Sequence, residues 1–332
     1  MRKYRTIIFA ALCMLSMIVL GPDITNGARE GVTLCLRVVI PALFPFFVIS
    51  TYLNGQLSGL NLRVLRPIET LCSMPRNSGP ILLLGLLGGY PVGAQSIAQW
   101  HENKTLDTRD AERLLGFCNN PGPAFIFGML SAFFPSQKYL WTLWLIQILS
   151  ALLTGMVLPG RQKATCKLSA AVPITLPQAL ERSVRSILLV CGWVVLFRII
   201  LSFFASSPNS MQIFLCGITE LTNGCMQLNN IRSLDMRFVA ASAFLSFGGL
   251  CVHMQTLSAA KGLRLRHYFI GKLIQTILSV VLSVIIMKLI CSEKATLDTN
   301  EIWILLLSLI AIGIGIIFFR KNSSISKANV IQ

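Results

Sequence analysis

The chain has 332 residues, of which 54% are apolar and only 13% are charged. Soluble domains carry about twice that charged share, so this composition excludes an ordinary soluble protein and favours one that lies in a membrane. The net charge of +16 could indicate nucleic acid as a partner, but the basic residues lie between long apolar stretches. We therefore expect the lipid bilayer as a partner and no nucleic acid.

About eight apolar stretches are long enough to cross a bilayer as helices, which takes about 20 residues each. Two further apolar segments are short or interrupted by glycine, proline and polar residues. This pattern predicts an all-α polytopic membrane protein with about eight transmembrane helices plus two re-entrant hairpins. The predicted spans are Arg5–Gly21, Val32–Leu53, Ala111–Phe134, Tyr139–Pro159, Ile187–Phe204, Phe238–Ala259, Phe269–Ile290 and Ile302–Phe319, and the predicted hairpins are Ile81–Ala98 and Met211–Leu228.

The N-terminal segment has two interpretations. Arg2, Lys3 and Arg5 precede an apolar stretch, as they would in a secretory signal peptide. No Ala-x-Ala-like cleavage site follows cleanly, so we expect an uncleaved first span.

The basic residues of the loops set the orientation. With the N-terminus in the cytoplasm, and with each hairpin returning to the side that it entered from, Lys and Arg favour the cytoplasmic side by roughly three to one. If either hairpin crossed the membrane completely, all later loops would change sides and this charge bias would weaken. We therefore predict a multi-pass protein of the bacterial cytoplasmic membrane with both termini cytoplasmic.

The predicted elements repeat along the chain. After a first helix and loop (residues 1–30), residues 31–160 contain a span, a hairpin, a broken span and a span. The same order returns in residues 187–291, after a cytoplasmic linker (161–186) and before a last helix and cytoplasmic tail (292–332). Each half has an odd number of crossings, so the second must be inverted relative to the first. Paired interrupted segments in inverted halves are the best sequence indication of a transporter's binding site.

The first hairpin is interrupted by glycine and proline. A glycine costs a helix interior about 1 kcal/mol and a proline about 3 kcal/mol. Inside a bilayer, such a break persists only where it is buried in protein or lines a wet cavity. Tyr90 could stack on a planar ligand, or it could simply pack the turn beside the proline. The candidate binding residues here are Gly88, Gly89, Tyr90, Pro91 and Gly93.

The second hairpin carries one carboxylate, Glu220, followed by Thr222 and Asn223. An ionisable residue inside a membrane is a functional-site hypothesis by default. Glu220 could bind a solute or carry a coupling proton. The alternative is a structural ion pair with Arg198, which lies deep in the predicted span Ile187–Phe204.

Two predicted spans contain breaks of their own. Asn119 and Asn120 precede Pro121-Gly122-Pro123 in the middle of an apolar run. We interpret this sequence as an unwound helix whose amides supply hydrogen-bonding groups; the alternative is a loop with Ala111–Cys118 on the surface.

In the later span, Gly248 and Gly249 form a break that His253 and Gln255 follow. His253 could relay protons, although a lone membrane histidine is more often a hydrogen-bonded packing residue. All four residues are candidates for the binding site.

Signals for catalysis are poor. The sequence has no His/Glu pair at zinc-site spacing, no Gly-x-Ser-x-Gly and no phosphate-binding loop. We expect no enzyme, no catalytic residue, no metal ligand and no cofactor. The charged run from Glu102 to Arg113 is interpreted as the solvated, amphipathic start of a span, with Asp107 as the N-cap.

Three motifs resemble a known family. Gly88–Ala94, Phe117–Phe125 and Phe247–Gln255 are similar to the YlbJ-type sporulation integral membrane proteins. These belong to the nucleoside-recognition (Gate) domain group, with spore maturation proteins and the membrane part of ferrous iron transporters. The resemblance covers roughly residues 32 to 290 and implies a role in spore formation.

The chain is more distantly similar to concentrative nucleoside transporters, in which paired hairpins and unwound helices hold the nucleoside. By that likeness, Glu220 and Asn223 would correspond to polar contacts of the second hairpin. The first hairpin departs from the likeness, since it has Gly-Gly-Tyr-Pro and no carboxylate.

Two functional hypotheses follow. The first is a transporter-like protein that binds a small polar solute, such as a nucleoside-like one, and a coupling ion between the two hairpins. The second is a non-transporting membrane factor for spore envelope assembly, with other sporulation proteins as partners. Both hypotheses are compatible with a monomer or an oligomer of this protein.

Overall fold

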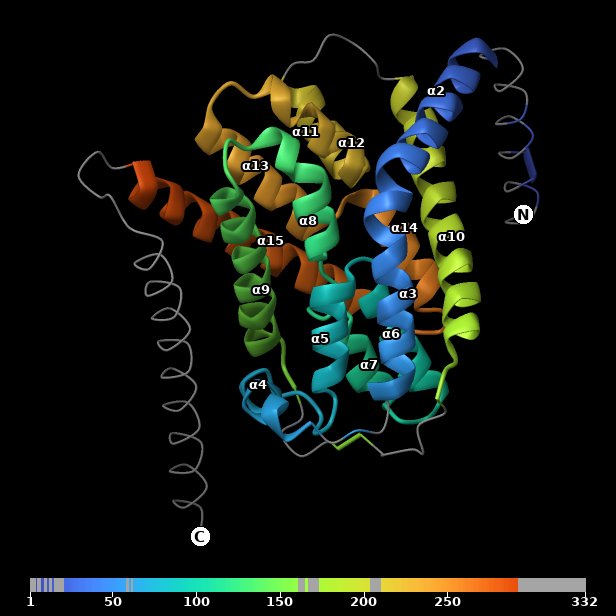
Figure 1. The fold of residues 1–332 in the computed structure, drawn as a ribbon, viewed down its shortest axis with the longest axis vertical. Coiled ribbons are helices and arrows are strands. Elements are labelled where there is room, and N and C mark those ends of the chain that lie inside the picture. Colours follow the sequence, from blue (N-terminus) through green and yellow to red (C-terminus); the bar gives the residue numbers. More distant parts are fainter. Residues whose placement is uncertain are drawn as a thin grey trace.

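The computed structural model describes residues 21–57, 62–160, 173–203 and 210–291, together with residues 4, 7, 8, 11, 14, 60, 165 and 166. The named elements in these residues are helices (Figure 1), which agrees with the predicted all-α class. The predicted last span, Ile302–Phe319, and the tail lie outside the described residues, and so does most of the predicted first span, Arg5–Gly21.

The first long helix is continuous from Gly21 to Leu57. It consists of α2 (Gly21–Leu34), a π-helical turn (Cys35–Val39) and α3 (Ile40–Leu57). It therefore begins well before the predicted start at Val32. The wider turn stands directly before Pro41, whose ring and missing N–H disturb regular α-helical bonding.

The first predicted hairpin is two short helices that contact each other, α5 (Gly79–Gly88) and α6 (Val92–Glu102). Both lie in the lower part of Figure 1, and α5 contacts α4 (Arg66–Leu71). Helix α5 ends where Gly89 takes a φ of +78°, a conformation that glycine adopts without strain.

The predicted break at Asn119–Pro123 is confirmed. Helix α7 (Thr108–Leu114) is followed by non-helical backbone up to Gly122, and α8 (Pro123–Met129) then begins, extended by a 3₁₀ turn, Leu130–Phe133. Figure 1 shows α7 in the lower part of the molecule and α8 in the upper part. Leu114 and the residues that follow it are buried, so the alternative of a surface loop is wrong.

The sequence pattern predicted that the charged run from Glu102 to Arg113 is solvated. The structure shows that this is only partly true. Arg113 is only 4% exposed and donates hydrogen bonds to the carbonyl oxygens of Cys72, Ser73, Gly155 and Leu158. It therefore ties the end of α4 to the end of α9 (Gln137–Val157). A buried guanidinium is tolerated because carbonyl groups satisfy its donors.

The remaining helices follow the predicted order. After α9 the chain contains a long helix, a second pair of short helices, a broken pair and a final long helix. These are α10 (Leu176–Ser202), α11 (Ser210–Thr219), α12 (Leu221–Met226) with a 3₁₀ turn (Gln227–Asn230), α13 (Leu234–Phe247), α14 (Gly249–Ala259) and α15 (Arg266–Cys291).

The break between α13 and α14 is also confirmed, since Gly248 and Gly249 take φ values of +84° and +74°. Helices α11 and α12 lie in the upper part of Figure 1, at the end opposite α5 and α6.

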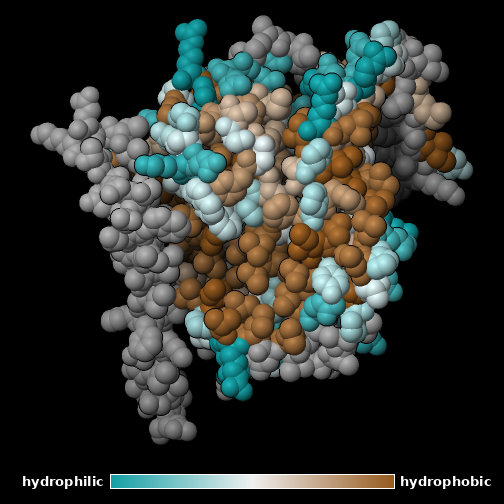
Figure 2. Space-filling model, viewed as in Figure 1, coloured by the Kyte–Doolittle hydropathy of each residue, from teal (hydrophilic) through white to brown (hydrophobic). Residues whose placement is uncertain are grey.

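Within the described residues, five helical stretches are long and apolar enough to cross a membrane: Gly21–Leu57, Gln137–Val157, Leu176–Ser202, Leu234–Ala259 and Arg266–Leu289. The predicted span Ala111–Phe134 is not among them because its break divides it into short helices. Apolar side chains cover much of the face in Figure 2. Elsewhere in the described residues, exposed apolar side chains include Leu188 and Leu189 of α10 and Ile277 of α15. These surfaces suit contact with lipid, as expected of a multi-pass membrane protein.

Candidate functional site

The first hairpin packs backbone-to-backbone against the Asn119–Pro123 break. A Cβ at Gly89 would lie 2.9 Å from the backbone nitrogen of Gly122. Cβ atoms at Gly85 and Gly93 would both overlap the carbonyl oxygen of Cys118. Glycine at these places lets the two interrupted segments touch. Close packing alone is therefore a sufficient reason for a glycine at position 93, without any contact to a ligand.

The second half repeats this arrangement. A Cβ at Gly249 would lie 3.1 Å from the backbone nitrogen of Leu221 and 3.2 Å from the carbonyl oxygen of Gly217. The hairpin α11–α12 therefore meets the α13–α14 break as the hairpin α5–α6 meets the α7–α8 break. In each half, the interruption of the hairpin contacts the interruption of the span that follows it.

Glu220 forms the interruption in the second hairpin and is only 1% exposed. Its carboxylate accepts hydrogen bonds from the backbone N–H groups of Thr222 (3.0 Å) and Asn223 (2.7 Å), and from Nδ2 of Asn223 (2.7 Å). It thereby caps the first turn of α12. The expected alternative, an ion pair with Arg198, is wrong, because Arg198 pairs with Glu30 on α2.

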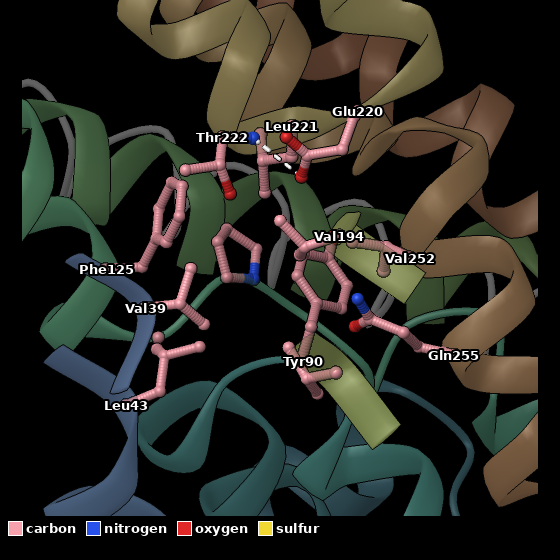
Figure 3. A pocket seen from close by; sticks show the side chains of 13 residues that line it. Val39, Leu43, Tyr90, Phe125, Val194, Glu220, Leu221, Thr222, Val252 and Gln255 are labelled. Atoms are coloured by element: carbon pink, nitrogen blue, oxygen red, sulfur yellow. Dashed lines mark hydrogen bonds between the residues drawn. The ribbon is translucent and has the colours of Figure 1, made fainter. Parts of the chain in front are cut away.

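A small cavity lies where these elements converge. Four predicted site residues line it, with Glu220 and Thr222 on one side and Tyr90 and Gln255 on the other (Figure 3). Its volume is about 40 Å³. The rest of its wall is mostly apolar and comes from the π-helical turn, α3, the Asn119–Pro123 break, α8, α10, α12 and α14: Val39, Leu43, Pro121, Gly122, Phe125, Val190, Val194, Leu221 and Val252.

The remaining predicted site residues surround the cavity without lining it. Gly88 packs against Ser50 and Val92, and Asn223 is bound to Glu220. His253 has Nδ1 at 2.8 Å from the hydroxyl of Tyr268, while its Nε2 has no partner in the part of the chain that the structure describes. The other residues in this group are Gly89, Pro91, Gly93, Asn119, Asn120, Gly248 and Gly249.

Lys272, which is not among the predicted site residues, is completely buried. Its Nζ donates to the hydroxyl of Tyr90 at 3.0 Å and to Oε1 of Gln275 at 2.8 Å. Among the described residues, Lys272 has no carboxylate partner. The three-to-one charge bias counts Lys272 on the cytoplasmic side, but the structure buries this lysine inside the protein. The available signal was its position inside the predicted span Phe269–Ile290, but a lysine near a helix end usually reaches the membrane surface.

The two predicted amides connect the halves of the chain. Nε2 of Gln275 donates to Oδ1 of Asn120 at 2.8 Å. Nδ2 of Asn119 donates to the hydroxyl of Thr256 at 2.9 Å, while its Oδ1 accepts from the backbone N–H of Ala94 at 3.3 Å. Their role in the structure is thus to hold α14 and α15 against the first half.

The site offers hydrogen bonding and charge. Its polar lining consists of one carboxylate (Glu220), one amide (Gln255) and the hydroxyls of Tyr90 and Thr222, and Lys272 lies behind Tyr90. Within the described residues, no group of three or more His, Cys, Asp or Glu side chains could hold a metal ion.

Comparison with known proteins gives one relative. The chain is 25% identical to the sporulation integral membrane protein YlbJ of Bacillus subtilis (strain 168), and the match covers 86% of this chain and 84% of that protein. The predicted resemblance to YlbJ-type sporulation integral membrane proteins is thereby confirmed. No family model matches the chain. No solved structure matches it either.

Proposed function

We propose that this multi-pass, YlbJ-type membrane protein is transporter-like and binds a small polar solute between its two hairpins. The observation that carries the proposal is the convergence of both hairpins and both broken spans on one cavity. Such breaks at membrane depth are characteristic of solute sites in transporters built from inverted repeats. The hairpins would be re-entrant from opposite sides, with both termini in the cytoplasm.

The volume of the cavity restricts what it holds in this conformation. About 40 Å³ leaves room for a few water molecules, at about 10–15 Å³ each. A nucleoside or a solute of similar size would require the two halves to separate. The contacts that join the halves, from Lys272 to Tyr90 and from Gln275 to Asn120, would then break and re-form during each cycle.

The name of the relative supports a role in spore formation. We propose that the solute reaches the developing spore, or leaves it, through this protein. The alternative is a non-transporting factor for assembly of the spore envelope, for which the small, mostly apolar cavity is the supporting observation.

A ligand screen tests the proposal. Purified protein would be heated with a library of nucleosides, sugars, amino acids and inorganic ions, and the melting temperature followed. We expect at least one solute to raise the melting temperature and to bind at least tenfold more weakly to Glu220→Gln. Glu181→Gln, at an exposed carboxylate on α10, is the matched control and should bind normally.

The opposite result also has a clear meaning. If no solute in the library shifts the melting temperature, while Glu220→Gln folds and still supports spore formation, the transport proposal is overturned and the assembly role is favoured. Equal binding of a solute by wild type and by both variants would place its site elsewhere.

A further inference from the structure

A second and larger cavity, which we call the α3–α6–α10 pocket, lies between those three helices. Its volume is about 220 Å³. Apart from Val92, all of its wall is polar or basic: Ser50, Thr51 and Asn54 from α3, Gln95, Ser96 and Gln99 from α6, and Arg182, Arg185 and Ser186 from α10. This composition contrasts with the mostly apolar central cavity.

Hydrogen bonds between the three helices fix the walls of this pocket. Nδ2 of Asn54 donates to Oε1 of Gln99 at 2.8 Å, and Oδ1 of Asn54 accepts from the indole N–H of Trp100 at 3.1 Å. Nε2 of Gln95 donates to the hydroxyl of Ser186 at 3.0 Å. The polar groups are therefore held in place before any ligand arrives, which reduces the entropy lost on binding.

One wall residue lacks a hydrogen-bond partner. Ser96 is 1% exposed, and its hydroxyl has none within the described part of the chain. Leaving a buried hydroxyl unsatisfied costs about 1–3 kcal/mol. A ligand oxygen in the pocket would satisfy it.

The charged side chains that line the pocket are all positive. Arg182 and Arg185 both line it, and no carboxylate does. The nearest acidic neighbour in sequence, Glu181, instead lines a shallow surface with Arg185 and the apolar side chains of α10. No ion pair joins either arginine to a described carboxylate. Guanidinium groups match the geometry of phosphate oxygens through paired hydrogen bonds.

We propose that the α3–α6–α10 pocket binds a phosphate group. The two arginines supply the charge, and the Ser96 hydroxyl with the surrounding amides supplies neutral hydrogen bonds. The phosphate could belong to a free anion or to the headgroup of an anionic lipid, since the pocket adjoins the exposed apolar face of α10. This site is separate from the central cavity, and its existence does not depend on transport.

The test uses the full chain purified in detergent, with inorganic phosphate as the probe at constant ionic strength set by chloride. We expect phosphate to raise the melting temperature of the wild type. The double variant Arg182→Gln/Arg185→Gln should bind phosphate at least tenfold more weakly, and Ser96→Ala about three- to tenfold more weakly. The matched control is Arg63→Gln/Arg109→Gln, which removes the same charge from exposed positions outside the pocket.

A second arm distinguishes the two sources of phosphate. The same variants would be placed in nanodiscs of phosphatidylcholine, with or without phosphatidylglycerol, and bound lipid measured by native mass spectrometry. Retention of phosphatidylglycerol that inorganic phosphate displaces identifies a lipid headgroup, whereas phosphate binding without lipid retention identifies a free anion. Two results overturn the proposal: binding of neither probe, or equal weakening by the pocket and control variants.

Discussion

Lys272 donates a hydrogen bond to the hydroxyl of Tyr90, with 3.0 Å between Nζ and the phenolic oxygen. The ammonium group also lies 4.9 Å from the centre of the tyrosine ring, within range of a cation–π interaction. The last described helix of the second half is thereby joined to the first hairpin. The hydroxyl of Tyr90 donates in turn to the carbonyl oxygen of Leu245 at 3.1 Å. Tyr90 therefore does more than pack a turn.

Replacing Lys272 should impair the function of the protein without lowering its thermal stability much. Lys272→Met removes a buried charge that is expensive to keep in an apolar interior, but it also leaves the buried Oε1 of Gln275 without its donor. Because these two effects oppose each other, the melting temperature should change little. Spore formation should nevertheless fail in a host that lacks the native protein. Lys288→Met, at an exposed lysine of the same helix, is the control and should support normal sporulation. Normal sporulation with Lys272→Met would show that the buried charge is dispensable.

Alanine at the packed glycines should destabilise the fold. In Gly85→Ala and Gly93→Ala, the new methyl group would overlap the carbonyl oxygen of Cys118, which is backbone and cannot move away cheaply. We expect the melting temperature to fall by several degrees or the protein to misfold. Gly192→Ala has open space around its Cβ in α10 and should be neutral, or stabilising by up to about 1 kcal/mol. Equal behaviour of the three variants would contradict the packing described.

Removing the charge of Glu220 should weaken the second hairpin. The carboxylate accepts three hydrogen bonds, and Glu220→Gln replaces one of its acceptor oxygens with a donor. We expect a loss of about 1–2 kcal/mol, typical of a lost N-cap. Thermal unfolding in detergent measures this loss. If a solute stabilises Glu220→Gln enough to restore the wild-type melting temperature, then binding of that solute does not require the Glu220 carboxylate.

The bonds of Arg113 should stabilise the end of the molecule where α4 and α9 meet. Arg113→Ala would leave the carbonyl oxygens of Cys72 and Leu158 without this donor in a buried place. Each unsatisfied group costs about 1–3 kcal/mol, so the melting temperature should fall clearly. Arg109→Ala changes an exposed arginine four residues away in the chain and should have little effect. Limited proteolysis would show whether the connection before α5 opens first.

The sequence predicted the elements of this fold that depend on local chemistry. Glycine and proline marked the breaks at Gly89, Asn119–Pro123 and Gly248, because no regular helix continues through such residues without cost. Glu220 stood out as an isolated carboxylate in an apolar hairpin. Tyr90, Glu220, Thr222 and Gln255 do meet at one cavity.

What the sequence did not predict depends on tertiary contacts. Val39 and Leu43, like Val190 and Val194, are ordinary apolar residues four positions apart, and nothing in their spacing distinguishes a cavity wall from a lipid-facing surface. Lys272 was counted with the cytoplasmic basic residues, and Arg113 was interpreted as part of a solvated run, because each lies near the end of an apolar segment. Their burial depends on Tyr90 and on the carbonyl groups at the end of α9, which are distant in sequence.

The second hairpin meets the broken span of the first half around one shared cavity. Phe125 of α8 and Thr222 of α12 line this cavity together (Figure 3). The direct measurement is cross-linking of Phe125→Cys with Thr222→Cys, using a short bifunctional maleimide in a chain whose native cysteines are replaced. Efficient intramolecular cross-linking, with neither single variant cross-linked, is the predicted result. Absence of the cross-link, with each cysteine freely labelled from an opposite side of the membrane, would contradict it.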